Sequence, residues 1–485
     1  MKRALLEKLF GQATICETHL SLVVLKDDLA WKWKKSVHLP FVDQSTAARR
    51  RELCFKEVEL NRAYAPSVYL GVGCTNGEWL SDDPEAPGAV EWCVRMRRFR
   101  QEGDKALAAG LLTPRVLRDF ADSIAATHAT LRRAPADASM TVQQDQLDNV
   151  EYLEQHGQAE RVAAVRAWLE REGPLLAPVL ARRQAAGMVR ECHGDLHLSN
   201  TVLLEDRLVA FDCLEFNEAL RTTDVCADIA FFVMDLDFRR QAELGSVFLA
   251  QYLEASGDFA ALELLTYFLV YRTMVRAKVH CIGGNGARAA QHVALALRYL
   301  QPRQPLLVLM CGASGSGKSF VSAELVQHLP AVRVRSDVER KRLFDLAPLE
   351  RGHDPSALYS AEASERVQAR LEEVARLVLR CGQSVVVDAT SQKRSVRDSF
   401  RRVCGECGGR FVLVCCRADV EVMRQRIRAR LQAGNDPSDA TEEVLQSQLA
   451  HCEPPGPDEP HIRVDTSANL TPEQVRSIAI DYVLK

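Results

Sequence analysis

The chain has 485 residues, of which 47% are hydrophobic and 26% are charged, with a formal net charge of −3 at pH 7. This length exceeds one ordinary hydrophobic core, so roughly two or three domains are expected. The near-neutral charge argues against bulk nucleic-acid binding. The fifteen cysteines are scattered, which argues against a short disulfide scaffold. The sequence has no apolar run of about 20 residues, which argues against a membrane span.

The N-terminal half has the pattern of a small strand-rich lobe followed by a larger helical lobe. Strands are predicted at 20–25, 30–34 and 89–97, and helices at 52–63 and 114–128. From about 159 to 300 the pattern is mostly helical and is interrupted chiefly at 189–213. This layout predicts an α+β domain over residues 1–300.

The interruption contains the string HGDLHLSN at 193–200, and Asp212 follows a short apolar run. Transfer of a phosphoryl group to a hydroxyl needs a carboxylate that accepts the hydroxyl proton, and an amide and a second carboxylate that hold magnesium. Asp195 and Asn200 have the D-x4-N spacing of a kinase catalytic loop, and Asp212 stands where the second carboxylate belongs. We therefore predict Asp195 as the catalytic base and Asn200 and Asp212 as Mg²⁺ ligands beside a bound ATP.

A kinase also places a strand lysine on the α- and β-phosphates of ATP and holds it with a helix carboxylate. Lys32 and Lys34 share one face of the second predicted strand, and Lys34 is the preferred ATP contact, with Glu57 on the following helix as its partner. No glycine-rich loop precedes this strand, so the turn near 16–19 is the alternative cover for the phosphates. The rival partner carboxylates are Glu52 and Glu59.

The HGD-x4-N string and the later aspartate resemble those of the aminoglycoside phosphotransferase-like kinases. The resemblance implies a protein-kinase-like fold for residues 1–300 and is sharp between 190 and 235. In that family the first aspartate is the catalytic base and the later one binds metal. Asp224 and Asp228 resemble the segment that follows, and we interpret them as residues that cap helices and fix loops. An aminoglycoside substrate does not follow, because fold is a poor guide to the acceptor.

A linker, Gln301-Pro302-Arg303-Gln304-Pro305, separates the predicted domains 1–300 and 306–485, because two prolines in five residues suit neither a helix nor a central strand. Beyond it strands alternate with helices, which predicts an α/β domain with a parallel sheet. The predicted strands are 306–311, 331–335, 384–388, 411–416 and 462–464, and the helices include 318–328, 393–404 and 419–431.

Residues 312–319 have the pattern G-x4-G-K-[ST] between a predicted strand and a predicted helix, which is the context of a P-loop. Its glycines allow backbone N–H groups to surround the β-phosphate, and the helix N-terminus adds a positive dipole end. Lys318 is expected on the β- and γ-phosphates and the Ser319 hydroxyl on Mg²⁺. The predicted ATP-binding residues are Gly312, Ala313, Ser314, Gly315, Ser316, Gly317, Lys318 and Ser319.

Three further residues are candidates in this second domain. Asp388 ends a buried strand and is the predicted Walker-B-like metal ligand. The domain resembles small P-loop kinases such as polynucleotide kinase and gluconate kinase, in which an aspartate after the second strand meets the acceptor hydroxyl. By that resemblance Asp337 is the candidate base and Arg340 a substrate or phosphate contact. The alternative role of Asp337 is a helix N-cap.

An arginine-rich helix before the loop 434–439 resembles the lid that closes over the phosphate in these kinases. Arg426 is its candidate ATP contact, and residues 465–467 resemble the family's late loop near the adenine. The cysteines of 404–416 are a weak zinc candidate, because two of them are adjacent in a predicted buried strand.

These patterns leave three functional hypotheses open. The first is a bifunctional Mg-ATP-dependent kinase whose acceptors are unidentified small molecules. The second is one catalytic module controlled by a nucleotide-sensing or pseudokinase partner module. The third is a nucleic-acid 5′-hydroxyl kinase in the C-terminal domain, against which the near-neutral charge argues. The composition favours a cytoplasmic protein with reduced thiols and no membrane partner, and it does not determine the oligomeric state.

Overall fold

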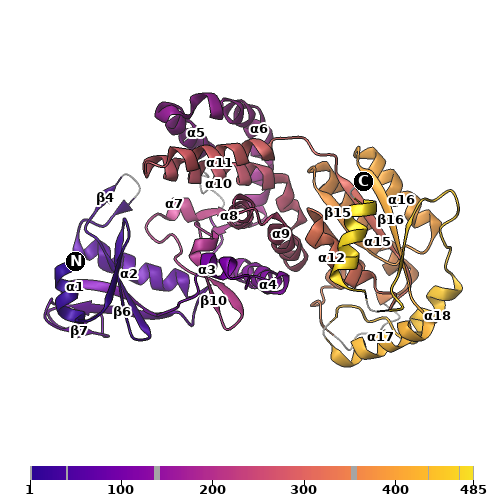
Figure 1. The fold of residues 1–485 in the computed structure, drawn as a ribbon, viewed down its shortest axis with the longest axis horizontal. Coiled ribbons are helices and arrows are strands. Elements are labelled where there is room, and N and C mark those ends of the chain that lie inside the picture. Colours follow the sequence, from indigo (N-terminus) through magenta and orange to yellow (C-terminus); the bar gives the residue numbers. More distant parts are fainter. Residues whose placement is uncertain are drawn as a thin grey trace. The chain divides into compact units, whose positions relative to one another are not determined.

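The computed structural model describes residues 3–39, 42–135, 142–350, 358–434, 436–468 and 470–483. The chain forms two compact units, of which the first comprises Met1–Arg240 and Leu264–Leu300, and the second Gln241–Glu263 and Gln301–Lys485 (Figure 1). One border thus falls beside the proline-containing linker, while the segment Gln241–Glu263 joins the second unit, which its sequence pattern did not indicate. None of the helices in the described ranges is long and apolar enough to cross a bilayer.

The first unit begins with an antiparallel sheet in the strand order β1-β2-β3-β8-β6-β7. Alternation along β3 directs Trp31 and Trp33 to a core with α1, and Ala30 to a core with α2 on the opposite face. Lys32 and Lys34 therefore share the α2 face. The elements are α1 (Arg3–Phe10), β1 (Thr14–Glu17), β2 (Ser21–Lys26), β3 (Leu29–Lys34), β4 (His38–Leu39), β5 (Val42–Asp43), α2 (Ala47–Asn61), β6 (Tyr69–Thr75), β7 (Leu80–Ser81) and β8 (Glu91–Arg97).

The remainder of the first unit is mainly helical, with two short antiparallel strand pairs, β10 with β11 and β9 with β12. Its apolar helix α8 is buried along almost its whole length. The elements are α3 (Gly103–Ala108), α4 (Pro114–Thr130), α5 (Val142–Leu153), η1 (Glu154–Gln158), α6 (Ala159–Ala185), β9 (Val189–Glu191), η2 (Leu198–Asn200), β10 (Thr201–Leu204), β11 (Arg207–Ala210), α7 (Glu218–Arg221), β12 (Thr222–Asp224), α8 (Val225–Phe238), α10 (Leu262–Ile282) and α11 (Gly286–Tyr299).

The second unit contains a parallel five-stranded sheet in the order β14-β15-β13-β16-β17. All six residues of β13 are buried, as expected for a central strand covered on both faces. The elements are α9 (Ala242–Ser256), η3 (Phe259–Ala261), β13 (Leu306–Cys311), α12 (Lys318–His328), β14 (Ala331–Arg335), α13 (Ser336–Leu343), α15 (Ala361–Arg380), β15 (Ser384–Asp388), α16 (Arg394–Glu406), β16 (Arg410–Arg417), α17 (Val420–Ala433), α18 (Glu442–Ala450), β17 (Ile462–Asp465), α19 (Pro472–Ile478) and η4 (Ala479–Val483).

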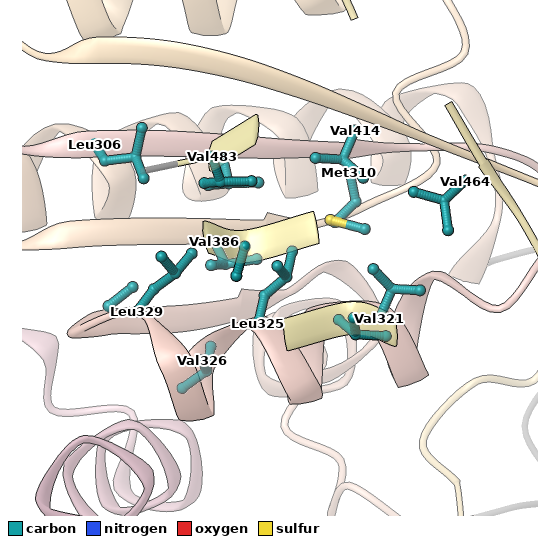
Figure 2. Packing of buried hydrophobic residues seen from close by; sticks show 14 of the residues in the cluster. Leu306, Met310, Val321, Leu325, Val326, Leu329, Val386, Val414, Val464 and Val483 are labelled. Atoms are coloured by element: carbon teal, nitrogen blue, oxygen red, sulfur yellow. The ribbon is translucent and has the colours of Figure 1, made fainter. Parts of the chain in front are cut away.

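An aliphatic core fixes α12 against the sheet. Met310 of β13 and Val386 of β15 belong to one buried cluster with Val321 and Leu325 of α12 (Figure 2). Burial of each such side chain contributes about 1.5–3 kcal/mol. Because β13 and α12 flank the P-loop, this core determines where the loop lies. An α+β kinase-like unit and an α/β P-loop unit with a parallel sheet confirm the predicted fold classes.

Candidate active sites

The first site is built where the loop after β9 meets the end of β11. Asn200 Nδ2 donates to the Asp195 carboxylate at 2.8 Å and to its carbonyl oxygen at 3.0 Å. Asp212 has a φ of 64°, in the left-handed region that costs a non-glycine residue energy, and its N–H donates to the Tyr69 hydroxyl at 3.1 Å. The N–H of Phe211, which precedes Asp212, donates to the Asn200 carbonyl oxygen at 3.0 Å, so the structure brings the three predicted residues near one another and holds Asp212 in the left-handed region.

Buried carboxylates of helix α8 accept hydrogen bonds from the backbone of this loop. Asp228 accepts from the N–H groups of His193 and Gly194 at 2.7 and 3.0 Å, and Asp235 accepts from the N–H of Leu198 at 3.0 Å. Asp224 caps α8 through the N–H of Cys226. The predicted roles of Asp224 and Asp228 in capping a helix and fixing a loop are confirmed.

The Asp195 carboxylate is held in its charged form. Desolvation by the surrounding protein would raise its pKa, but His197, whose Nε2 lies 3.4 Å from the carboxylate, holds the pKa well below its ordinary value, with help from Arg276 and His193. Its side chain is 36% exposed, so a hydroxyl can approach it. The Asp195 carboxylate is therefore ionised and accessible.

The two lysines of β3 lie at different depths. Lys34 is fully buried and forms ion pairs with Glu57, at 2.7 Å, and with Glu215. Lys32 is 15% exposed and bridges Glu57, at 2.9 Å, and Asp212, at 2.5 Å. Lys34, predicted as the ATP contact, is thus enclosed by carboxylates, whereas Lys32 lies at Asp212, the predicted metal ligand. Alternation along the strand showed only that the lysines share a face and could not distinguish their depths.

The two lysines compensate the charge of buried carboxylates. Burial would raise the pKa of Glu57, but Lys32 and Lys34 lower it to about 2. Burial dominates at Glu215, whose pKa lies above its ordinary value although Lys34 opposes the shift. The partner predicted for the lysine, Glu57, is therefore held ionised, while Glu52 and Glu59 are exposed and belong to surface pairs.

Substitution of each of the two lysines should change the stability of the first unit by a different amount. Lys34→Met leaves the buried carboxylate of Glu215 without its cation and is expected to destabilise the first unit by about 3–5 kcal/mol. Lys32→Met is expected to cost less stability, because Glu57 keeps Lys34. Urea denaturation followed by tryptophan fluorescence measures this unit alone, since its five tryptophans are the only ones in the chain.

Lys56→Met is the matched control, because Lys56 makes a surface pair with Glu59 on α2 and should change stability by less than about 1 kcal/mol. Equal losses of stability in the Lys32 and Lys34 variants would contradict the assigned depths.

The P-loop in the second unit joins β13 to α12, as predicted. Gly312 has a φ of 140°, and a Cβ there would lie 2.4 Å from the Cys416 carbonyl oxygen. Gly315 has a φ of 79°, and a Cβ would lie 2.6 Å from the Met423 carbonyl oxygen. Both positions thus require glycine on two grounds, backbone conformation and close approach.

Charged groups converge at the mouth of this loop. Lys318 Nζ donates to the Ala313 carbonyl oxygen at 2.8 Å, which folds the side chain back over the loop. Asp388 at the end of β15 accepts from Arg333 at 2.8 Å and from the Ser322 hydroxyl at 2.9 Å. Burial would raise the pKa of Asp388, but Arg333, Arg335 and Lys318 lower it to about 2. Asp388 is therefore ionised beside the loop.

Lys318 and Asp388 line a pocket of about 730 Å³, a size suited to a nucleotide or small ligand. Lys318, Ser319, Asp337, Asp388 and Arg426 all contribute to its wall. Asp337 is the second residue of α13 and the N-cap is Arg335, so the N-cap alternative is wrong. Arg340 also lines the pocket and lies over the Tyr359 ring, 4.7 Å from its centre.

Arg426 connects the P-loop to the late loop. It donates to the Gly315 carbonyl oxygen at 3.3 Å and to the Thr466 carbonyl oxygen at 2.6 Å. Two other arginines of α17, Arg424 and Arg428, pair with Glu442. Arg426 thus holds the P-loop and the late loop together at the pocket wall. The predicted lid loop 434–439 includes residue 435, which lies outside the described residues.

The sequence reading missed the arginines of β14 and the contribution of α9. Arg335 lines the pocket and pairs with Glu254 of α9, at 3.5 Å, and with Asp436, at 3.4 Å. Arg342 donates to the Glu254 carbonyl oxygen at 2.6 Å. The only available signal was the alternation of Arg333 and Arg335 on one strand face, directly before Asp337.

The cysteines of 404–416, a weak zinc candidate in the sequence, belong to no group of three possible ligands among the described residues. Among the described residues, the one group of three possible ligands is His128, Cys192 and Asp228, in which Asp228 is engaged by the catalytic loop. Cys415 and Cys416 are buried in β16.

Comparison with known proteins agrees with this architecture. The model of the phosphotransferase enzyme family matches residues 67–265, and the model of an AAA domain matches residues 307–455. An uncharacterized protein of Mycobacterium tuberculosis is 32% identical over 452 residues, covering 90% of this chain and 89% of that protein. The chain thus combines a phosphotransferase domain with a P-loop kinase-type domain, as the motifs predicted.

Two solved structures are similar in part. Choline kinase from Cryptosporidium parvum is 11% identical, with a TM-score of 0.39, over 60% of this chain and 89% of that one. The APS kinase CysC of Mycobacterium tuberculosis is 23% identical, with a TM-score of 0.29, over 38% of this chain and 100% of that one.

Proposed function

The chain belongs to the family of the mycobacterial protein that it matches along most of its length, and from this premise we propose that it is a kinase with two separate sites. In each site the γ-phosphoryl group of ATP passes to a hydroxyl of a small-molecule acceptor. A cytoplasmic location is part of the proposal and is supported by the fifteen cysteines, none of which forms a disulfide in the described residues.

The observation that carries the first site is the convergence of Asp195, Asn200, Asp212 and Lys32. Asp195 orients the acceptor hydroxyl and accepts its proton as the new O–P bond forms and the bond to ADP breaks. Lys32, rather than Lys34, binds the phosphates of ATP, because it is the partly exposed lysine at Asp212. Glu57 keeps Lys32 in position.

Magnesium fits both sites by the chemistry of the groups present. Carboxylate, amide and hydroxyl oxygens are ligands that Mg²⁺ prefers. Asn200 and Asp212 would hold the ion in the first site, and Ser319 and Asp388 in the second. When bound, the ion neutralises charge on the phosphates. The left-handed backbone at Asp212 and the low pKa of Asp388 support these assignments.

In the second site the residues 312–319 cradle the phosphates, and Lys318 contacts the β- and γ-phosphates. Asp337 is the proposed base, since it lies on the pocket wall with Lys318 and Arg340. Arg426 supports the nucleotide site by bracing Gly315.

Titration of the full chain with Mg²⁺ and a non-hydrolysable ATP analogue tests the two-site proposal by calorimetry. We expect two nucleotides bound per chain, and one per chain after Lys318→Ala. A stoichiometry of one for the unaltered chain would leave a single nucleotide site and reject the proposal. Two bound nucleotides with transfer from only one unit would favour the regulatory alternative, in which the second module senses nucleotide.

A further inference from the structure

A stripe of basic side chains on α10 begins beneath the catalytic loop of the first unit. Arg272, Arg276 and His280 are spaced by four residues and therefore share one helix face. The Arg272 guanidinium lies over the Phe231 ring, 4.8 Å from its centre, and His197 of the catalytic loop contacts the same ring, with 5.3 Å between ring centres. The stripe thus starts at the loop that carries Asp195.

Helix α11 extends this basic surface. His292 of α11 stacks on Phe238, at the end of α8, with 3.7 Å between ring centres, and its ring lies 5.2 Å from that of His280. Arg288 lies one turn before His292, and its guanidinium is 5.4 Å from the centre of the Phe238 ring. Helices α10 and α11 therefore carry four basic side chains, which we call the α10–α11 basic cluster: Arg276, His280, Arg288 and His292.

The two arginines of this cluster make no ion pair within the described residues, although Arg276 acts on the Asp195 carboxylate over a longer distance. Neither Arg276 nor Arg288 has a carboxylate within ion-pair distance there, and the buried Nδ1 of His292, a side chain 1% exposed, has no hydrogen-bond partner. The neighbouring Arg239 differs, since it pairs with Asp104 at 2.8 Å and Asp235 at 3.0 Å. Burial and the nearby cations lower the pKa of His292 to about 3, which agrees with a positive local potential.

We propose that the acceptor of the first unit is anionic, a hydroxyl compound whose carboxylate or phosphate group is bound by Arg276 and Arg288. The inference rests on the phosphotransferase function proposed above. Arg276 acts on the reacting carboxylate of Asp195 but makes no direct ion pair among the described residues, so it can bind an anionic group of the acceptor. It disfavours amines and aminoglycosides, because like charges close together are repelled. Chemically, the hydroxyl oxygen bonds to the γ-phosphorus, ADP leaves, and the hydroxyl proton passes to Asp195.

The test uses the full chain carrying Lys318→Ala, so that only the first unit transfers phosphate. Metabolites from a cell extract are separated into a fraction retained by anion-exchange resin and a flow-through of neutral and cationic compounds. Each is incubated with γ-labelled ATP. We expect Asp195-dependent labelling in the retained fraction. Labelling confined to the flow-through would overturn the inference while leaving the proposed function intact, and no Asp195-dependent labelling in either fraction would overturn both.

Variants of the basic cluster then test which residue binds the anion. With the active fraction as acceptor, Arg276→Gln is expected to raise the apparent KM for the acceptor at least tenfold, with the KM for ATP within twofold and partial recovery in Arg276→Lys. Arg298→Gln is the matched control, since Arg298 is exposed on α11 and lies outside the cluster, and it should change neither KM. An unchanged acceptor KM in Arg276→Gln would overturn the assignment.

Discussion

Replacing Asp195 with asparagine is expected to lower acceptor phosphorylation by the first unit about 10²–10⁴-fold, the range found when a general base is removed. The side chain keeps its shape and can still contact Asn200, but it can no longer take the hydroxyl proton. Labelling of metabolites from γ-labelled ATP, in a chain that also carries Lys318→Ala, measures this effect. Binding of the ATP analogue should persist, because Lys32 and Asp212 remain.

Asp206→Asn is the matched control for this substitution. Asp206 is exposed in the turn between β10 and β11, and its positive φ of 64° is one that asparagine tolerates. Because the pKa of Asp195 is depressed, the carboxylate is charged at every pH above its ordinary value of 3.8. Protonation of Asp195 should therefore cause no loss of transfer at neutral or mildly acidic pH. If Asp195→Asn retained full phosphoryl transfer, Asp195 would not be the base that accepts the hydroxyl proton.

Replacing Lys318 with alanine is expected to lower transfer by the second unit about 10²–10³-fold, as for the removal of one preorganised charge at a reacting centre. Its ammonium group would otherwise stabilise the charge that develops on the β- and γ-phosphates. Burial lowers the pKa of Lys318, although Asp388 opposes the shift. Transfer is measured in a chain carrying Asp195→Asn, and nucleotide binding by calorimetry.

Arg380→Ala provides the control for the loss of a cation from the same unit, because Arg380 is exposed in the last turn of α15. It should leave both transfer and nucleotide binding unchanged. If Lys318→Ala retained full binding and transfer, the P-loop would have no part in the reaction. If Lys318→Ala lowered transfer but kept nucleotide binding, while Arg380→Ala changed neither, Lys318 would act on the reacting phosphate alone.

The chemistry-bearing motifs were readable because each is local in sequence. The P-loop needs glycines at fixed spacing for conformational reasons, and a Cβ added at Gly312 or Gly315 would lie too close to a neighbouring carbonyl oxygen. Likewise, Asp195 and Asn200 are five residues apart and meet within one loop. In both cases a short stretch of chain sets its own geometry, so the sequence pattern and the structure coincide.

Contacts between distant segments could not be read in this way. Lys32 and Lys34 lie on the same strand face and carry the same charge. Glu215 and Asp212 approach from the larger lobe, so that Lys34 is buried at Glu215 and Lys32 is partly exposed at Asp212. Arg333 reaches Asp388 across neighbouring strands, and Glu254 reaches Arg335 from a helix about 80 positions earlier in the chain.

The amino-acid sequence by itself determined the two fold classes, the alternation of strands and helices, and the two phosphate-handling motifs. These depend on periodicity, glycine conformation and short spacings, which act over a few residues. Only the tertiary structure decided which lysine faces Asp212, which arginines hold Asp388, and which cations of α10 and α11 make no ion pair among the described residues. The physical reason is that burial and charge pairing depend on every group within a few ångströms, whatever its position along the chain.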